Sequence, residues 1–228
     1  MYDPIDSTLK GVSARWVVEL APSELVLLSG MELAPSRSIS RFVEGAVEIP
    51  YARVRVSAFR LGEAILVAAL SANAEARAIR LEARPRKGLL NLRSSNSLFV
   101  EPSEGLTIWP AESLEAKVRT VAEELRSRGR NHIANVVYHI VAGNYLEPWQ
   151  QIARRVEKGL EARGLLQRAS TSEVDHRDFE PSIISTARRQ AMNLRALLLE
   201  HERDDPETWR LLIAGVKNGM ALARPRFV

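Results

Sequence analysis

Residues Ile79 to Arg93 read Ile-Arg-Leu-Glu-Ala-Arg-Pro-Arg-Lys-Gly-Leu-Leu-Asn-Leu-Arg, an alternating segment followed by a proline, a glycine and a pair of leucines. Alternation of apolar and charged residues is typical of a half-buried β-strand, and proline and glycine mark a turn. An extended pattern resumes after the leucines and ends at Pro102. These residues predict a β-hairpin over about 77–101, with its tip near Pro85 to Leu90.

The net charge of the protein is concentrated in this hairpin. Between Glu75 and Arg93 six basic residues stand against two acidic ones, so the segment carries +4. The whole chain of 228 residues also has a formal net charge of +4, which leaves a sum of zero for the rest. Its isoelectric point is about 9.7. A local cationic patch indicates an electrostatic partner more strongly than a high isoelectric point does.

The two adjacent leucines of the hairpin have two interpretations. If they are exposed at the tip, they can insert into a bilayer interface, and each neighbouring Lys or Arg adds about 1 kcal/mol of attraction to anionic lipid. If they pack on a neighbouring helix instead, the cations are ordinary solvated surface. The first interpretation makes the following residues candidate lipid ligands: Arg84, Arg86, Lys87, Leu89, Leu90 and Arg93.

The rest of the chain is mostly helical in pattern. Apolar residues recur at helical spacing, and proline, serine or aspartate at the starts and glycine at several ends mark the boundaries. The expected helices are 22–30, 58–76, 110–130, 131–142, 147–163, 181–201 and 206–223, with a strand over 47–56 and an exposed linker over 168–180. Hydrophobic residues make up 46% of the chain, enough for a substantial core. We therefore expect a mainly α, globular single domain over 1–228 with a projecting basic β-hairpin.

Several classes of function lack support in the sequence. There is no cysteine, which excludes disulfides and thiolate sites. Met1 to Lys10 contain two aspartates and a proline rather than the pattern of a signal peptide, and the longest apolar block, Ala64 to Leu70, is far shorter than the roughly 20 residues that span a bilayer. We therefore expect a cytoplasmic protein whose membrane contact is peripheral.

Catalytic and metal-binding motifs are also missing. The chain has no Gly-rich phosphate loop, no G-x-S-x-G elbow and no H-E-x-x-H motif. His132 and His139 are about 10 Å apart along a helix, too far to share one metal. Asp175 to Asp178 fall in the expected linker and are interpreted as solvated. We expect neither an enzyme nor a metal or cofactor site.

The order of these motifs resembles the Golgi phosphoprotein 3 family and its bacterial relatives. Members of that family open with an apolar helix that ends in glycine, as Glu24 to Gly30 does, and carry a small-residue helix that leads into a basic hairpin, as Ala64 to Leu70 leads to Arg86 to Leu90. A later helix of the family ends in a pattern that Leu160 to Leu166 matches, and its final helix often begins with Asp-Pro, as at Asp205-Pro206. The resemblance covers about 23–223.

This resemblance implies a helical domain whose hairpin lies at the cytosolic face of the Golgi, binds phosphoinositide headgroups and helps to retain glycosyltransferases there. It also implies a protein client and leaves a homo-oligomer possible. In the eukaryotic members the headgroup is held by a tryptophan and an arginine around the start of the small-residue helix and by two arginines three residues apart on a later helix. The region around Phe59 and Arg60 has no tryptophan, and the positions of the two later arginines fall on Gln150 and Ala153 in this chain. Neither is cationic, although Arg154 and Arg155 lie beside them and are further candidate lipid ligands. The hairpin matches the family better than the headgroup pocket does.

A DNA-binding regulator is the alternative from another class. Residues 131–142, the turn at Gly143-Asn144 and residues 147–163 can be read as a winged-helix core, with Arg154, Arg155 and Lys158 on the recognition helix. However, Glu147, Glu157 and Glu161 offset these cations, while the basic excess lies on the hairpin. Anionic membrane lipid is therefore the favoured partner, and nucleic acid is the alternative.

Overall fold

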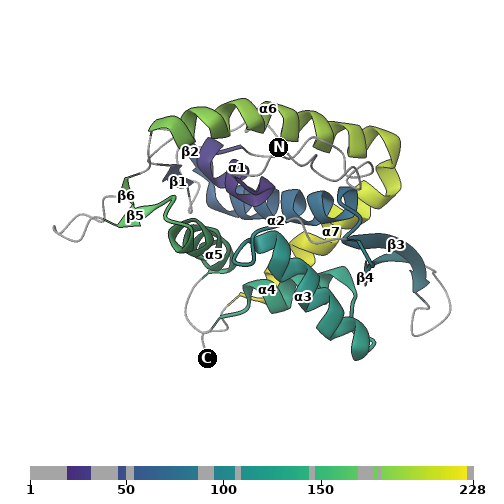
Figure 1. Ribbon diagram of the computed structural model, residues 1–228. Coiled ribbons are helices and arrows are strands. Elements are labelled where there is room, and N and C mark those ends of the chain that lie inside the picture. Colours follow the sequence, from purple (N-terminus) through teal and green to yellow (C-terminus); the bar gives the residue numbers. More distant parts are fainter. Residues whose placement is uncertain are drawn as a thin grey trace, which may run out of the picture.

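A computed structural model describes residues 20–31, 46–49, 54–86, 95–105, 109–143, 147–168, 177–178 and 181–224. Within these ranges the chain is mainly α-helical, with seven helices and three two-stranded antiparallel sheets (Figure 1). The mainly α fold and its β-hairpin are as predicted from the sequence. None of the described helices is long and apolar enough to cross a bilayer.

Helix α2 (Ala58–Glu75) runs through the centre of the molecule. Residues 61–73 are all buried. The helices that pack around them are α1 (Pro22–Ser29), α3 (Leu114–Ser127), α5 (Pro148–Ala162), α6 (Pro181–Asp204) and α7 (Pro206–Leu222). A helix that is buried on every side needs small residues where its neighbours approach, and Ala64, Ala68 and Ala72 are fully buried. Gly62 meets the same need, because an added Cβ would lie 3.0 Å from Cβ of Trp149.

The predicted hairpin leaves the C-terminal end of α2. Arg77 turns the chain with a φ of 55°, and β3 (Ile79–Arg86) then pairs with β4 (Ser95–Pro102) in a register that runs from Ile79 opposite Pro102 to Arg86 opposite Ser95. Pro85 lies opposite Asn96 inside this ladder. The first two residues of the tip expected over Pro85 to Leu90 are therefore paired, and residues 87–90 lie outside the described residues.

Three helices follow the hairpin. They are α3 (Leu114–Ser127), α4 (Ile133–Val141) and α5 (Pro148–Ala162), and residues of all three pack against one another. Ser113 caps α3 by accepting from the N–H of Ala116, and His132 caps α4 by accepting from the N–H of Ala134. The predicted ranges began a few residues early for α3 and α4, because these capping residues lie outside the helices that they start.

Two long helices complete the fold. Helix α6 (Pro181–Asp204) crosses one side of the molecule, and α7 (Pro206–Leu222) turns back to pack on α4 (Figure 1). The Asp205 carboxylate accepts from the N–H of Thr208 and so begins α7, as the Asp-Asp-Pro-Glu sequence predicts. Close packing of α4 on α7 requires glycine, because a Cβ at Gly219 would lie 2.5 Å from Cβ of Val137.

Two strand pairings in irregular regions were not predicted. The strand expected over 47–56 is a pair of short strands, β1 (Ala46–Ile49) and β2 (Val54–Ser57), which pair with each other. The linker expected over 168–180 includes paired backbone, because β5 (Gln167–Arg168) pairs with β6 (Arg177–Asp178). Alternation and polarity do not say where a chain reverses, so neither pairing could be read from the sequence. Asp175 and His176 lie outside the described residues.

Candidate functional site

The β3–β4 hairpin projects from one end of the helical body (Figure 1). Residues directly opposite in an antiparallel pair share a face, and successive residues alternate between faces. Ile79, Leu98 and Val100 are buried and hold one face of the hairpin against the body, and Asn96 donates to Glu207 of α7 at 2.6 Å. Arg80, Glu82, Arg84 and Glu101 occupy the other face. The hairpin is therefore anchored by its apolar face and carries its charges on the opposite one.

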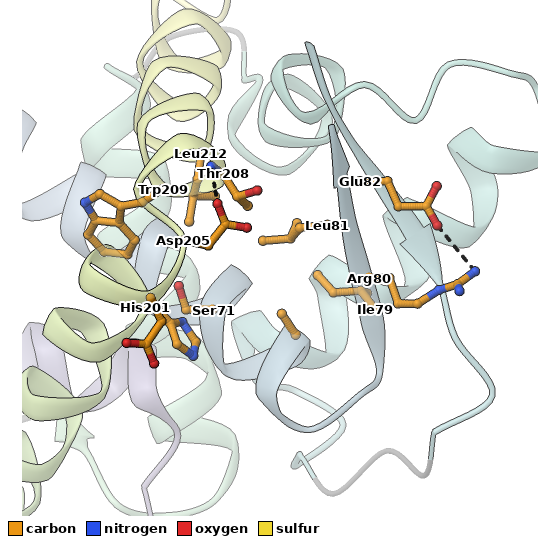
Figure 2. Close-up of a pocket in the computed structure, with 12 residues that line it drawn as sticks. Ser71, Ile79, Arg80, Leu81, Glu82, His201, Asp205, Thr208, Trp209 and Leu212 are labelled. Atoms are coloured by element: carbon orange, nitrogen blue, oxygen red, sulfur yellow. Dashed lines mark hydrogen bonds and ion pairs between the residues drawn. The ribbon is translucent and has the colours of Figure 1, made fainter. Parts of the chain in front are cut away.

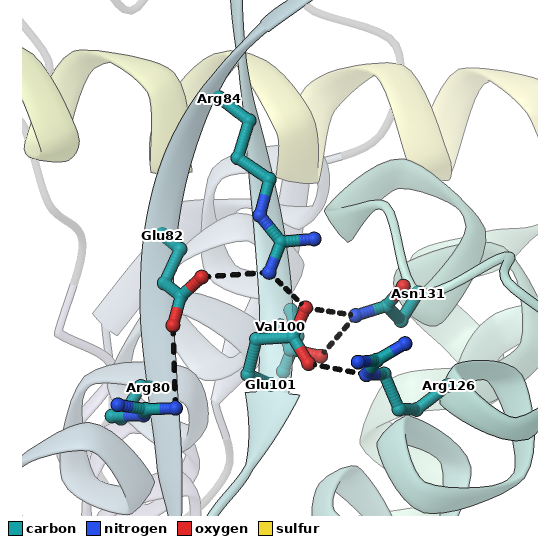
Figure 3. Close-up of polar contacts among 7 residues, drawn as sticks. All are labelled: Arg80, Glu82, Arg84, Val100, Glu101, Arg126 and Asn131. Atoms are coloured by element: carbon teal, nitrogen blue, oxygen red, sulfur yellow. Dashed lines mark hydrogen bonds and ion pairs between the residues drawn. The ribbon is translucent and has the colours of Figure 1, made fainter.

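Glu101 is the centre of a polar network on that charged face (Figure 3). Its carboxylate accepts from Arg84 Nη2 at 2.5 Å, from Arg126 Nε at 2.6 Å and from Asn131 Nδ2 at 2.9 Å. Burial acts to raise the pKa of Glu101, but the hydrogen bonds from Asn131 and Arg84 and the charge of Arg126 outweigh it and hold the pKa below its usual range. The network ties the hairpin to α3 and to the residue that precedes the cap of α4.

Arg84 is fixed within the hairpin. Its guanidinium donates to Glu82 at 2.6 Å as well as to Glu101, and it lies 5.0 Å from the ring centre of Phe99. The hydrogen bonds to Glu82 and Glu101, together with the charges of these two carboxylates, raise the pKa of Arg84. Arg80 also pairs with Glu82, at 3.4 Å. The described part of the hairpin thus offsets most of its positive charge internally, and the lipid-binding role expected of Arg84 stays a prediction.

The remaining predicted hairpin ligands lie at the end of β3 and in the segment that joins the two strands. Arg86 lies in β3, where its backbone pairs with Ser95. Lys87, Leu89, Leu90 and Arg93 lie outside the described residues. Residues 86–94 contain three cations and no acid, so the excess charge of the hairpin resides in this segment.

The candidate residues of α5 are not brought to the hairpin. Arg154 is exposed and Arg155 is partly buried, and α5 lies at the opposite end of the molecule from β3 and β4 (Figure 1). Gln150 accepts from the N–H of Glu147 at 3.1 Å and so helps to cap α5. Ala153 packs against the hydrophobic core. The two positions that match the family's headgroup arginines therefore have structural roles here.

A cavity of about 420 Å³ lies beside the first turns of α2 and α5. Phe59, Glu147, Trp149 and Arg224 are among its lining residues, and the Arg224 guanidinium lies 5.9 Å from the ring centre of Phe59. The sequence suggested no tryptophan near Phe59, because Trp149 is supplied by a different helix. Arg224 follows the last helix and had no motif that would have linked it to this cavity.

Two buried carboxylates were also missed. Glu24 and Glu115 are 1% and 0% exposed, and Arg163 donates to Glu24. Burial raises the pKa of Glu115 to about 7, and the charge of Glu24 adds to this effect. Ala21 is the capping residue of α1, and the Ser23 hydroxyl donates to Glu115. Glu24 follows a serine and Glu115 follows a leucine, and neither pattern distinguishes a buried carboxylate from an exposed one.

Histidines have structural contacts. Nδ1 of His132 accepts a backbone hydrogen bond and its ring packs edge-on against Phe99, while His139 packs edge-on against Tyr138. In the described ranges no three His, Asp or Glu side chains are grouped so that they could hold a metal ion.

In comparisons with known proteins, no protein-family model, no curated protein and no solved structure matches this chain.

Proposed function

We propose that this protein binds anionic membrane surfaces peripherally, through the β3–β4 hairpin. The observation that carries the proposal is the distribution of charge along the hairpin. Arg80 and Arg84 are paired with Glu82 and Glu101 within the paired strands, whereas Arg86, Lys87 and Arg93 flank Leu89 and Leu90 with no acidic residue among them. Cations beside apolar residues are the composition of an interfacial membrane anchor.

Anchoring at the base suits this role. The apolar face of the hairpin is buried against the body, and Glu101 connects it to Arg126 and Asn131. The described strands of the hairpin are thus already held in place on the body, so none of the binding energy is needed to order these strands.

Helix α6 offers a second surface of the same composition. Arg188, Met192, Arg195 and Leu199 follow one another at helical spacing and are all exposed. Met192 is 69% and Leu199 is 56% exposed, the largest values among the exposed large apolar side chains of the described residues. Both hairpin and helix would contribute a weak contact, and two weak contacts on one body bind more firmly than either alone.

Vesicle sedimentation tests the proposal. The protein should sediment with phosphatidylcholine vesicles that contain phosphatidylserine and remain in solution with phosphatidylcholine alone, and binding should weaken as salt rises. Replacing Arg86, Lys87 and Arg93 with Ala should weaken binding about a hundredfold, if each contributes about 1 kcal/mol. The matched control replaces Arg154, Arg155 and Lys158, which removes the same charge from α5. Equal loss in both variants would contradict the role of the hairpin.

The family resemblance supports phosphoinositides as one kind of anionic lipid. A separate set of vesicles in which phosphoinositide replaces phosphatidylserine at equal charge tests this preference. Stronger binding to phosphoinositide that is lost in Arg224→Ala would assign headgroup recognition to the cavity at Phe59 and Trp149. Equal binding to both lipids would leave general electrostatic attraction. The protein client, a homo-oligomer and a peripheral location at a cytoplasmic membrane surface are part of this proposal.

One structural observation supports the alternative function, DNA binding. Helices α3, α4 and α5 are followed by the paired strands β5 and β6, an order that resembles a winged helix. Arg154 and Lys158 are exposed on α5, but residues 169–176 between the strands contain two acidic residues and neither Lys nor Arg. Duplex binding at matched salt decides between the functions. A DNA-binding protein would bind duplex tightly and show a shallower salt dependence after replacement of Arg154, Arg155 and Lys158.

A further inference from the structure

A second cavity, of about 530 Å³, lies where the end of α2, strand β3 and the junction of α6 with α7 meet. Its volume is within the range of small-molecule sites in proteins. Leu81, Trp209 and Leu212 supply apolar lining, and Leu81 points from β3 toward α7 (Figure 2). Arg80 and Glu82 also line the cavity, and they pair with each other at 3.4 Å. These two opposite charges offset each other within the lining.

The inner end of the cavity has an unsatisfied hydroxyl. Ser71 is 1% exposed and lines the cavity, and its Oγ has no hydrogen-bond partner. In Figure 2 the oxygen of Ser71 points toward the space between Trp209 and Asp205. A buried hydroxyl without a partner costs free energy, and a bound polar atom in this space would remove that cost.

The outer end of the cavity is acidic. Asp204 and Asp205 both line it and are both exposed. The N–H of Thr208 donates to Asp205 at 3.0 Å, and this bond holds the pKa of Asp205 below its usual range. One carboxylate oxygen of Asp205 is used in this cap. Asp204 accepts from Arg203 at 2.9 Å, and the Arg203 side chain is 74% exposed. The carboxylates and the indole of Trp209 are groups that attract an ammonium ion.

From this order of groups we infer that the cavity binds a small organic amine. Its ammonium lies at Asp204 and Asp205, its apolar body packs between Leu81 and Trp209, and a hydrogen-bonding group at its far end reaches Ser71. The inference is independent of membrane binding, because it uses neither the hairpin tip nor the cations of α6.

Tyramine is a suitable probe, because it has an ammonium, an aromatic body and a terminal hydroxyl. Phenethylamine lacks the hydroxyl, and 3-(4-hydroxyphenyl)propionate replaces the ammonium with a carboxylate. Titration calorimetry with the full chain should show saturable binding of tyramine. Phenethylamine should bind about threefold to tenfold more weakly than tyramine, because a neutral hydrogen bond contributes roughly 0.5–1.5 kcal/mol. The propionate should bind at least tenfold more weakly than tyramine, because a hydrogen bond to a charged group contributes more.

Two variants test the same groups on the protein. Asp204→Asn should weaken tyramine binding about tenfold, whereas Glu202→Gln, a nearby exposed carboxylate that does not line the cavity, should leave it unchanged. Ser71→Ala should reduce the affinity for tyramine to that for phenethylamine without lowering the melting temperature, because the hydroxyl has no partner to lose. Absence of saturable binding, equal binding of the amine and the propionate, or equal effects of the two carboxylate variants would overturn the inference.

Discussion

Ser23 donates its backbone N–H and its hydroxyl to the two carboxylate oxygens of Glu115, at 2.7 Å and 2.9 Å. The two residues are 92 positions apart, so the contact joins α1 to the first turn of α3 in the middle of the core. Glu24 lies next to Ser23 and is buried as well, which places two carboxyl groups in one apolar region. The protonation of Glu115 therefore bears directly on the stability of the fold.

We expect the free energy of unfolding to fall as the pH rises from about 4.5 to about 7, because the Glu115 carboxyl group loses its proton in this range. Burial raises the pKa of Glu115 from its model-compound value of 4.5 to about 7, so the folded state binds the proton more tightly than the unfolded state across this window. Below the window the group contributes fully, and above it on the order of 3 kcal/mol is lost. Glu115→Gln mimics the protonated form and should flatten this part of the stability curve. Urea unfolding at several pH values measures it, and Glu124→Gln, an exposed residue of the same helix, should leave the slope unchanged.

The α4–α7 contact leads to a prediction about Gly219. Alanine is favoured over glycine in a helix by about 1 kcal/mol, yet a Cβ here would lie 2.6 Å from Cγ1 of Val137 and 2.7 Å from the backbone oxygen of Ala134. Gly219→Ala should therefore lower the free energy of unfolding by about 1–3 kcal/mol through overpacking. Asn218→Ala, at the exposed neighbouring position, should be neutral or stabilising. An increase in stability for Gly219→Ala would mean that the helices can separate without cost.

The network of Glu101 predicts unequal effects for two glutamates of the hairpin. The Glu101 side chain is 7% exposed and accepts from three donors, whereas the Glu82 side chain is 34% exposed. Glu101→Gln should cost about 1.5–3 kcal/mol, and Glu82→Gln less than about 1 kcal/mol. Because the pKa of Glu101 is lowered, its contribution is present above the unfolded pKa and is lost as the pH falls through the folded one. Chemical unfolding of both variants at neutral and acidic pH measures these differences, and equal costs would show that burial of Glu101 is unimportant.

Replacing Leu89 and Leu90 tests whether these side chains insert into a membrane or pack within the protein. If they insert into a membrane, Leu89→Ser with Leu90→Ser should weaken vesicle binding with every charge retained and should leave the melting temperature nearly unchanged. If they are core or subunit-interface residues, each replacement should cost about 2–5 kcal/mol or dissociate an oligomer. Vesicle partition and melting temperature are measured on the same variant. Intact partition with a large fall in melting temperature would leave the hairpin a purely structural element.

The exposed residues of α6 give a similar comparison. Met192→Ser with Leu199→Ser should reduce binding to anionic vesicles, while stability changes by less than about 0.5 kcal/mol per residue. Leu222→Ser is the control, because Leu222 is 53% exposed but lies on α7. Unchanged vesicle binding in the α6 variant would assign membrane contact to the hairpin alone.

The sequence by itself determined the elements whose signal is local. The apolar spacing of α2 and the positions of Leu114, Val118, Val121 and Leu125 on α3 predicted both helices, and all four of these residues are buried. Alternation from Ile79 onward predicted the hairpin, although not how far its strands pair. Such patterns can be recognised in the sequence because each helix or strand must turn one face to the core, and neighbouring residues alone define that face.

Only the tertiary structure decided which side chains meet across the chain. It paired Glu101 with Arg126, buried Glu115 beside Ser23, brought Trp149 to Phe59 and enclosed Ser71 between β3 and α7. None of these pairs shares a local period, because each depends on how whole helices pack. A charge on an exposed face and a charge in a buried network look the same in a sequence. Their difference is the dielectric environment that packing creates, and this is why the roles of Arg84 and Glu115 followed from the fold and not from the residue pattern.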